Sequence, residues 1–340
     1  MSPLPKKHLR SFFASAAAGA LFVLAIPLTG LIDHSARHGG NPVFDWYQHT
    51  AARQSIALRS AMTSVPDLDD PGMIRRGAGH YQLVCAACHG SPAAPAEQFA
   101  LNLSPTPPRL TAWRPEARLF QTVKYGIAHT AMPAWPTELR DDEVWSMVAF
   151  LRMLPTMDAP TYTDLAYGAS APGSCASCHG ENGEGRDGAF PRLDIQSPAY
   201  LIDALNAFRD GSRLSGTMMS AARHLSDAQI AELAQQFGKL APMGPTGGLG
   251  EDIALKGIVS RDIPACETCH SPNARADFPR LAGQSADYLR TQLELFQKHG
   301  AERGGKHAEI MSKVIEDALE EGPHRLEPEE IEAVADYYGR

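Results

Sequence analysis

The chain has few cysteines, no excess of positive charge and a moderate content of charged residues. Only 6 of its 340 residues are cysteine, and all lie in pairs with a two-residue gap, which excludes a disulfide scaffold as the main framework. Charged residues at 21% and hydrophobic residues at 44% exclude a disordered chain and a polytopic membrane protein. The net charge of −8 gives no basis for nucleic-acid binding, so we expect no nucleic-acid partner. The length suits two or three domains.

A histidine follows each cysteine pair directly, so that Cys-x-x-Cys-His occurs three times. The copies are Cys85, Cys88 and His89; Cys175, Cys178 and His179; and Cys266, Cys269 and His270. One helical turn places the two thiols on the same face, where they can attach to one edge of a porphyrin while the histidine ligates the iron. A thioredoxin-like pair or half of a zinc site could explain a single copy. Three copies that use every cysteine predict three covalently bound haem c groups.

The tripeptide Pro-Arg-Leu follows each histidine after a loop of different length. A histidine that ligates a metal needs its second ring nitrogen to donate a hydrogen bond, which fixes the ring orientation. In class I cytochromes c a proline carbonyl accepts this bond, and the three tripeptides resemble that element. The resemblance implies acceptors at Pro108, Pro191 and Pro279, and haem propionate contacts by Arg109, Arg192 and Arg280.

Methionine is the expected sixth ligand, since a thioether is soft and neutral and raises the reduction potential. In the third copy Met311 is the only methionine available. In the second, Met218 is favoured by its spacing from the following helix, and Met219 is the alternative. In the first, Met132 lies in Ala-Met-Pro-Ala-Trp, which resembles the methionine loop of single-haem cytochrome c domains. Rival ligands, each expected to be a solvated loop residue, are His129, His224, His299, His307 and His324.

The longest uncharged stretch runs from Phe12 to Ile32, and basic residues precede it. A helix of about 20 apolar residues crosses a membrane, and positive charges keep the preceding end in the cytoplasm. The sequence therefore predicts a membrane anchor over residues 1–32 in the bacterial inner membrane, with the haem domains in the periplasm. A cleaved signal peptide is the alternative, and it would export the same domains.

Two segments of the chain repeat each other. Residues 190–208 align with 278–296 without gaps, and 10 of 19 positions are identical. Residues from about 162 to 340 resemble the two-haem cytochromes of the c-four type, and residues from about 69 to 156 resemble single-haem domains of respiratory complexes. The expected fold is all-α, with three tandem class I cytochrome c domains behind the anchor. These are unit 1 (69–156), unit 2 (162–242) and unit 3 (250–340), and residues 33–68 form a connector.

Helical patterns predict where each unit begins and ends. Unit 1 should contain helices at Arg75–Val84 and Asp141–Leu154, and the resemblance implies that they cross at Gly77 and Trp145. In unit 2, Ser170–Ser174 replaces most of the helix expected before the motif, which puts the same crossing in doubt. Two later helices have marked starts, a capping box from Ser226 to Gln229 and a first-turn proline at Pro328.

Together these features predict an electron carrier that passes single electrons on the periplasmic face. Six-coordinate iron leaves no open position for a substrate, and no nucleophile–base motif, glycine-rich phosphate loop or additional metal cluster stands out. The expected partners are redox proteins, with a membrane dehydrogenase or quinol-oxidising complex as donor and a terminal oxidase as acceptor. One alternative is the cytochrome c subunit of a larger dehydrogenase or terminal oxidase complex. A second is a c-type haem peroxidase, which would require one haem to lack its methionine.

Overall fold

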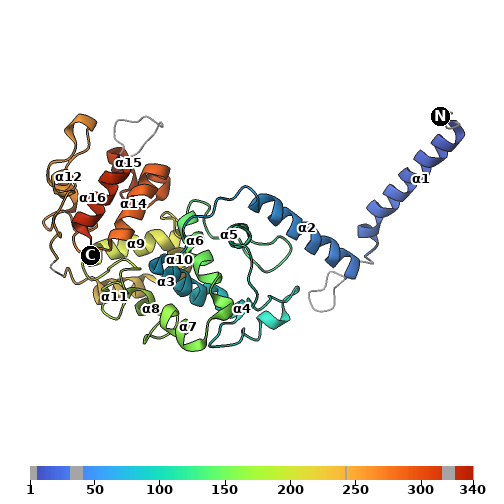
Figure 1. Ribbon diagram of the computed structural model, residues 1–340, viewed down its shortest axis with the longest axis horizontal. Coiled ribbons are helices and arrows are strands. Elements are labelled where there is room, and N and C mark those ends of the chain that lie inside the picture. The colour runs from blue at the N-terminus through green and yellow to red at the C-terminus, as the bar shows by residue number, and fades with distance from the viewer. Residues whose placement is uncertain (1–5, 31–40, 242, 316–325, 340) are drawn as a thin grey trace.

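The computed structural model describes residues 6–30, 41–241, 243–315 and 326–339, and its regular structure in these ranges is helical. Outside the helices these ranges contain only isolated β-bridges and no β-strand. The all-α prediction is therefore confirmed for the described residues. Figure 1 shows the first two helices, α1 (Lys6–Ala25) and α2 (Pro42–Ser60), extending away from a body that holds all the later ones.

Helix α1 covers only part of the predicted membrane span. It ends at Ala25, and a short 3₁₀ turn (Ile26–Thr29) that contains Pro27 follows it. In the part of the chain that the structure describes, no helix is long and apolar enough to cross a membrane. The last two residues of the predicted span, 31 and 32, lie outside that part.

Unit 1 is organised around α3 (Pro71–His80) and α6 (Asp141–Leu151). A π-helical turn (Tyr81–Cys85) leads from α3 into the short helix α4 (Ala86–His89), so both helices predicted for this unit are present with small shifts at their ends. The apolar side chains of α6 form the centre of the core because they face α3 and α5 (Glu116–Tyr125). The most deeply buried, each at most 1% exposed, are Val144, Met147, Val148, Ala149 and Phe150.

The crossing of α3 and α6 depends on a glycine. A Cβ atom on Gly77 would overlap the carbonyl oxygen of Ser146 and would lie 2.7 Å from Cβ of Phe150. The predicted crossing glycine is confirmed, but Trp145 is not its partner. Trp145 stacks on Phe120 of α5, with ring centroids 4.2 Å apart, because successive helix residues point in different directions.

Helix α7 (Ala159–Ala166) packs on unit 1, although the sequence places most of it in unit 2. Tyr162 is fully buried there, and its hydroxyl donates a hydrogen bond to Oε1 of Gln82 at 2.7 Å. Between α7 and the second motif the described chain contains turns and no further helix. Within the described residues, unit 2 therefore has no first helix of its own to cross its last helix.

Units 2 and 3 each contain several helices, one of which is the short helix at the motif. Those of unit 2 are α8 (Cys175–His179), α9 (Pro198–Asp210), α10 (Gly216–Ala222) and α11 (Asp227–Phe237). Those of unit 3 are α12 (Glu251–Lys256), α13 (Glu267–His270), α14 (Ala286–His299), α15 (Ala308–Ile315) and α16 (Pro328–Tyr338). The predicted capping box at the start of α11 and the first-turn proline of α16 are confirmed. In unit 3 the helix crossing is present, since a Cβ on Gly250 would overlap the Ala333 carbonyl oxygen.

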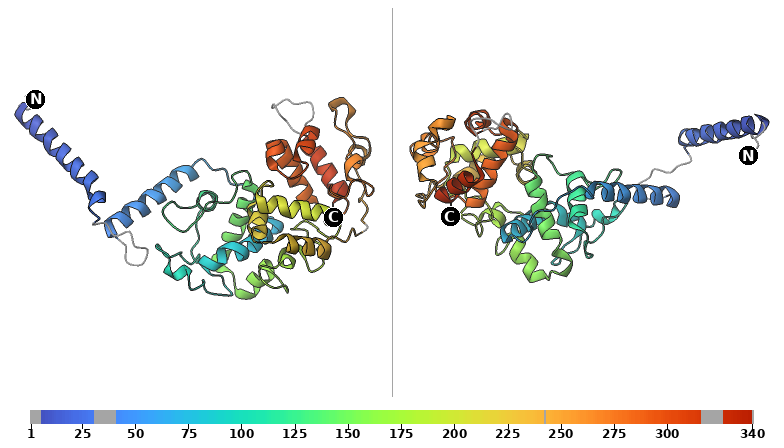
Figure 2. Two further views of the ribbon diagram at one scale, coloured as in Figure 1. Left: turned by 180° about the vertical axis from the view of Figure 1, so that it is seen from behind. Right: turned by 45° about the horizontal axis from the view of Figure 1, so that its top comes forward.

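Units 2 and 3 face each other through a pair of equivalent contacts. The side chain of Gln196 donates to the carbonyl of Arg280 and accepts from its backbone N–H, both at 2.9 Å. Gln284 does the same with Arg192, at 3.0 and 2.6 Å. The two glutamines occupy matching positions of the sequence repeat, so the repeat produces an approximate two-fold relation between the units. Figure 2 shows the orange and red helices of unit 3 beside the yellow helices of unit 2 in both views.

Candidate functional site

Each Cys-x-x-Cys-His motif ends at the last residue of a short helix, α4, α8 or α13, and its first cysteine begins or immediately precedes that helix. The two cysteines of each motif are one helical turn apart and share a face, as the prediction requires. None of the six cysteines forms a disulfide. Burial raises the pKa of Cys85 to about 12 and that of Cys266 to about 11.

Each motif histidine makes the hydrogen bond that the sequence predicts. The distance from the histidine Nδ1 to the proline carbonyl oxygen is 2.8 Å at Pro108, 2.9 Å at Pro191 and 2.8 Å at Pro279. Because a carbonyl only accepts, Nδ1 carries the proton and Nε2 keeps its lone pair for a metal. Burial also lowers the pKa of His179 and His270, which keeps both rings neutral at pH 7.

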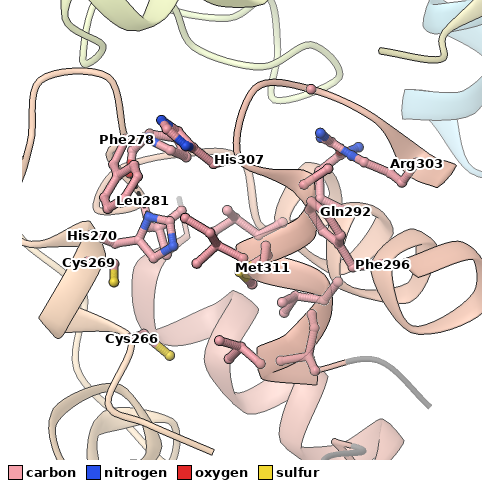
Figure 3. Close-up of a pocket in the computed structure, with 18 of the residues that line it drawn as sticks. Cys266, Cys269, His270, Phe278, Leu281, Gln292, Phe296, Arg303, His307 and Met311 are labelled. Atoms are coloured by element: carbon pink, nitrogen blue, oxygen red, sulfur yellow. Dashed lines mark hydrogen bonds between the residues drawn. The ribbon is translucent and has the colours of Figure 1, made fainter. Parts of the chain in front are cut away.

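The third motif opens into a deep apolar pocket. Figure 3 shows Cys266, Cys269 and His270 at one side of the pocket and Met311 of α15 lining the same space. Apolar side chains complete the wall, among them Leu281, Leu289, Leu293, Phe296 and Val334. Such a wall suits a flat hydrophobic porphyrin, with thiols at one edge and an imidazole and a thioether as axial ligands. The residues present therefore fit a haem c group.

The rival histidines are less suited to ligate iron than the methionines. His307 lines the third pocket, but its Nε2 is paired with Oδ2 of Asp277 at 2.9 Å. His299 is not among the residues that line this pocket. His129 and His224 are exposed at the surface of units 1 and 2, and His324 lies outside the described residues. The geometry of the third pocket therefore favours Met311 as the sixth ligand.

The three arginines of the Pro-Arg-Leu elements are not equivalent. Arg280 has a buried Nη1 without any hydrogen-bond partner, as expected of a group that would bind a propionate. Arg109 donates to the backbone carbonyl of Ser91 at 3.3 Å. Arg192 forms a bidentate ion pair with Asp194, at 2.9 and 2.5 Å. This ion pair depends on an aspartate two residues after Arg192, where unit 3 has Ala282, and the propionate contact of Arg192 stays a prediction.

The methionine segments of units 1 and 2 are held by backbone hydrogen bonds. In unit 1, the carbonyl of Met132 accepts from the N–H of Ile127 at 3.1 Å, and its own N–H donates to the Thr130 hydroxyl at 3.1 Å. In unit 2, Met218 and Met219 lie on α10, whose start is capped by the Ser215 hydroxyl accepting from the Met218 N–H at 3.1 Å. The side chains of all three methionines are half-buried.

A buried arginine between units 2 and 3 was not predicted from the sequence. Arg213 is 7% exposed, donates to the hydroxyls of Tyr200 and Tyr288 at 3.1 and 2.9 Å, and lines the third pocket. Burial, together with the positive charge of Arg213, lowers the pKa of Arg303 to about 9. Tyr200 and Tyr288 lie at matching positions of the repeat. This match is the sequence signal from which their shared contact with Arg213 could have been predicted.

Known proteins similar to this chain are cytochromes c. Residues 72–151 match the family described as cytochrome C oxidase, cbb3-type, subunit III, and residues 166–235 match the cytochrome c family. The thiosulfate dehydrogenase electron acceptor of Thiomonas intermedia is 40% identical over 164 residues, covering 44% of this chain and 75% of that protein. Cytochrome c4 of Pseudomonas aeruginosa is 30% identical over 183 residues, covering 51% of this chain and 87% of that protein. The solved structure of Acidithiobacillus ferrooxidans cytochrome c4 has a TM-score of 0.40 and 29% identity, covering 48% of this chain and 96% of that one.

This chain covers 75% of the first of these two sequence relatives and 87% of the second, which is more than two thirds of each. Cytochrome c domains imply covalently bound haem c, and the cysteine pairs provide the attachment points. The chain therefore belongs to the cytochrome c family, is related to the c4-type cytochromes, and is an electron carrier rather than an enzyme.

Proposed function

We propose that the chain is a three-haem c-type cytochrome that transfers single electrons between a respiratory donor and an acceptor on the periplasmic face of the membrane. One observation carries this proposal. A cysteine pair and a histidine whose Nδ1 bonds a proline carbonyl occur three times in the same arrangement. When bound, each haem c supplies an iron that gains and loses one electron.

The residues of each unit have distinct tasks in this proposal. The cysteines would hold the porphyrin, the histidine Nε2 would ligate the iron, and the methionine thioether would supply the second ligand and exclude water. The pairs that would ligate the iron are His89 with Met132, His179 with Met218 (or Met219), and His270 with Met311. Two axial ligands in every unit favour electron transfer over the peroxidase alternative, which needs an open iron position.

The relatives support redox protein partners for this chain. One relative is named as the electron acceptor of thiosulfate dehydrogenase, which supports a dehydrogenase of that type as donor. A quinol-oxidising complex remains the other candidate. The match of unit 1 to an oxidase subunit family supports a terminal oxidase as acceptor, and also favours the alternative that the chain is a subunit of such a complex.

We also propose that the haem domains are exported to the periplasm. The basic residues and the apolar stretch at the amino terminus support export, whether the segment stays in the inner membrane as an anchor or is cleaved. Both outcomes place the three motifs on the same side of the membrane.

Fractionation of cells that carry the tagged full-length chain tests function and location together. Haem-staining protein should appear in the membrane or periplasmic fraction, together with a dehydrogenase, a quinol-oxidising complex or an oxidase. After reduction by dithionite, the purified protein should return its electrons to an oxidised partner from that fraction without forming any other product. Recovery of a haem-free chain in the cytoplasm, or failure to reoxidise, would contradict the proposal.

A further inference from the structure

Unit 1 contacts unit 2 directly beside Met132 of unit 1 and Met218 of unit 2. Trp135 is 8% exposed and follows Met132 by three residues, while Gly216 and Thr217 immediately precede Met218. A Cβ atom on Gly216 would overlap Nε1 of the indole and would lie 2.6 Å from its Cε2. The edge of the indole of unit 1 therefore lies against the backbone at the start of α10 in unit 2.

A buried histidine and a partly buried glutamate of unit 1 hold this contact in place. His80 is 4% exposed, lies 4.3 Å from Trp135 between ring centroids, and has its Nδ1 2.9 Å from the Thr217 hydroxyl. Oε2 of Glu143 accepts from the indole N–H at 3.2 Å and from the Gly216 backbone N–H at 2.7 Å. Glu143 therefore bonds both sides of the contact through one carboxylate oxygen.

Helix α3 of unit 1 also covers the second motif. A Cβ atom on Gly79 would lie 3.0 Å from Sγ of Cys178 and 3.3 Å from Cζ of Phe190. Unit 2, which contains this motif, has no first helix of its own in the described residues. Because α3 lies over Cys178, a separate protein has no access to the second motif from this side.

We propose that this surface, called here the Trp135 contact (His80, Trp135, Glu143, Gly216 and Thr217), is the route by which unit 1 exchanges electrons with units 2 and 3 in the same chain. The inference rests on the proposed function. In the step, reduced unit 1 loses one electron and oxidised unit 2 gains it, and no bond is formed or broken. A buried contact fixes the distance between the segments that contain Met132 and Met218. A flexible covalent connection between the units does not fix this distance.

The test distinguishes the Trp135 contact from the covalent connection between units 1 and 2 as the feature that keeps the two units together. A protease site is inserted in the exposed segment Ala171–Gly173, and the folded, haem-loaded chain is then cleaved. Gly216→Leu places a side chain against the indole, whereas the matched control Gly244→Leu adds the same side chain where no atom lies within 4 Å. Thr217→Val removes only the hydroxyl that meets His80. Haem content and the ferric methionine–iron charge-transfer band are recorded for each variant. A failure of the proposed function is then seen separately from a failure of the Trp135 contact.

The two fragments of the cleaved parent chain should co-elute on size exclusion, and so should those of cleaved Gly244→Leu. After a sub-stoichiometric electron pulse, electron redistribution between these fragments should not depend on protein concentration. The cleaved Gly216→Leu fragments should separate, and their exchange should become concentration-dependent. Thr217→Val should raise the dissociation constant of the fragments about three- to tenfold, as expected for one hydrogen bond. Separation of the cleaved parent fragments would overturn the inference. It would also be overturned by concentration-independent exchange in cleaved Gly216→Leu, or by an unchanged dissociation constant in Thr217→Val.

Discussion

Replacing Met311 by alanine is expected to remove the sixth ligand from the proposed haem of unit 3 and leave those of units 1 and 2 intact. Met311 is the methionine in the pocket that holds Cys266, Cys269 and His270. Because a neutral thioether favours ferrous iron, its loss should lower the reduction potential of this site alone. The ferric methionine–iron charge-transfer band should lose one of three contributions, and the reduced protein should bind carbon monoxide.

Met153→Ala is the matched control for this variant, since Met153 is 38% exposed and lies outside the third pocket. That variant should keep the full band and bind no carbon monoxide. In unit 2 the same measurement on Met218→Ala and Met219→Ala assigns the ligand, since only one of these variants should lose one of the three contributions to the band. If Met311→Ala keeps its full band, a histidine is the sixth ligand in unit 3, and the third site has a lower potential than proposed.

Gly77→Ala is expected to destabilise unit 1 strongly. The added Cβ would overlap the backbone oxygen of Ser146, which cannot move without shifting α6. Overpacking of this kind costs about 1–3 kcal/mol, and more where backbone must move. The midpoint of one thermal unfolding transition, followed by circular dichroism and by the loss of the methionine band, should fall.

The matched control is Gly72→Ala on the same helix. A Cβ there meets only the side chains of Arg76 and Asp70, at 3.2 Å or more, so alanine should be neutral or stabilise by about 0.5–1 kcal/mol. Equal midpoints for the two variants would show that the helix crossing does not depend on Gly77.

Features set by neighbouring residues were predicted well from the sequence. The capping box at Ser226 forms because its two partners are three residues apart, a spacing that any helix start provides. The bonds between the motif histidines and the prolines were predicted because the tripeptide recurs after each motif. Gly77 was identified because the resemblance places a glycine at the helix crossing, although Trp145 was wrongly chosen as its partner.

Features that depend on docking between distant segments could not be predicted in the same way. Gly216 looks like any helix-start glycine, and only the folded chain brings the indole of Trp135 against it. Arg192 lies in the same tripeptide as Arg280, but its guanidinium forms a bidentate ion pair with the carboxylate of Asp194. The stretch from Phe12 to Ile32 looks continuous in the sequence, whereas in the described residues α1 ends at Ala25 and a 3₁₀ turn that contains Pro27 follows it.

The most direct test of the three-haem assignment is the mass of the denatured full-length chain. Three covalent haem c groups on six thioether bonds should raise the mass above that of the polypeptide by three haem groups, and no thiol should react with an alkylating reagent. Peptide mapping should place one haem on each of the three cysteine pairs. A mass increase of two haem groups, or a disulfide within any pair, would contradict the account.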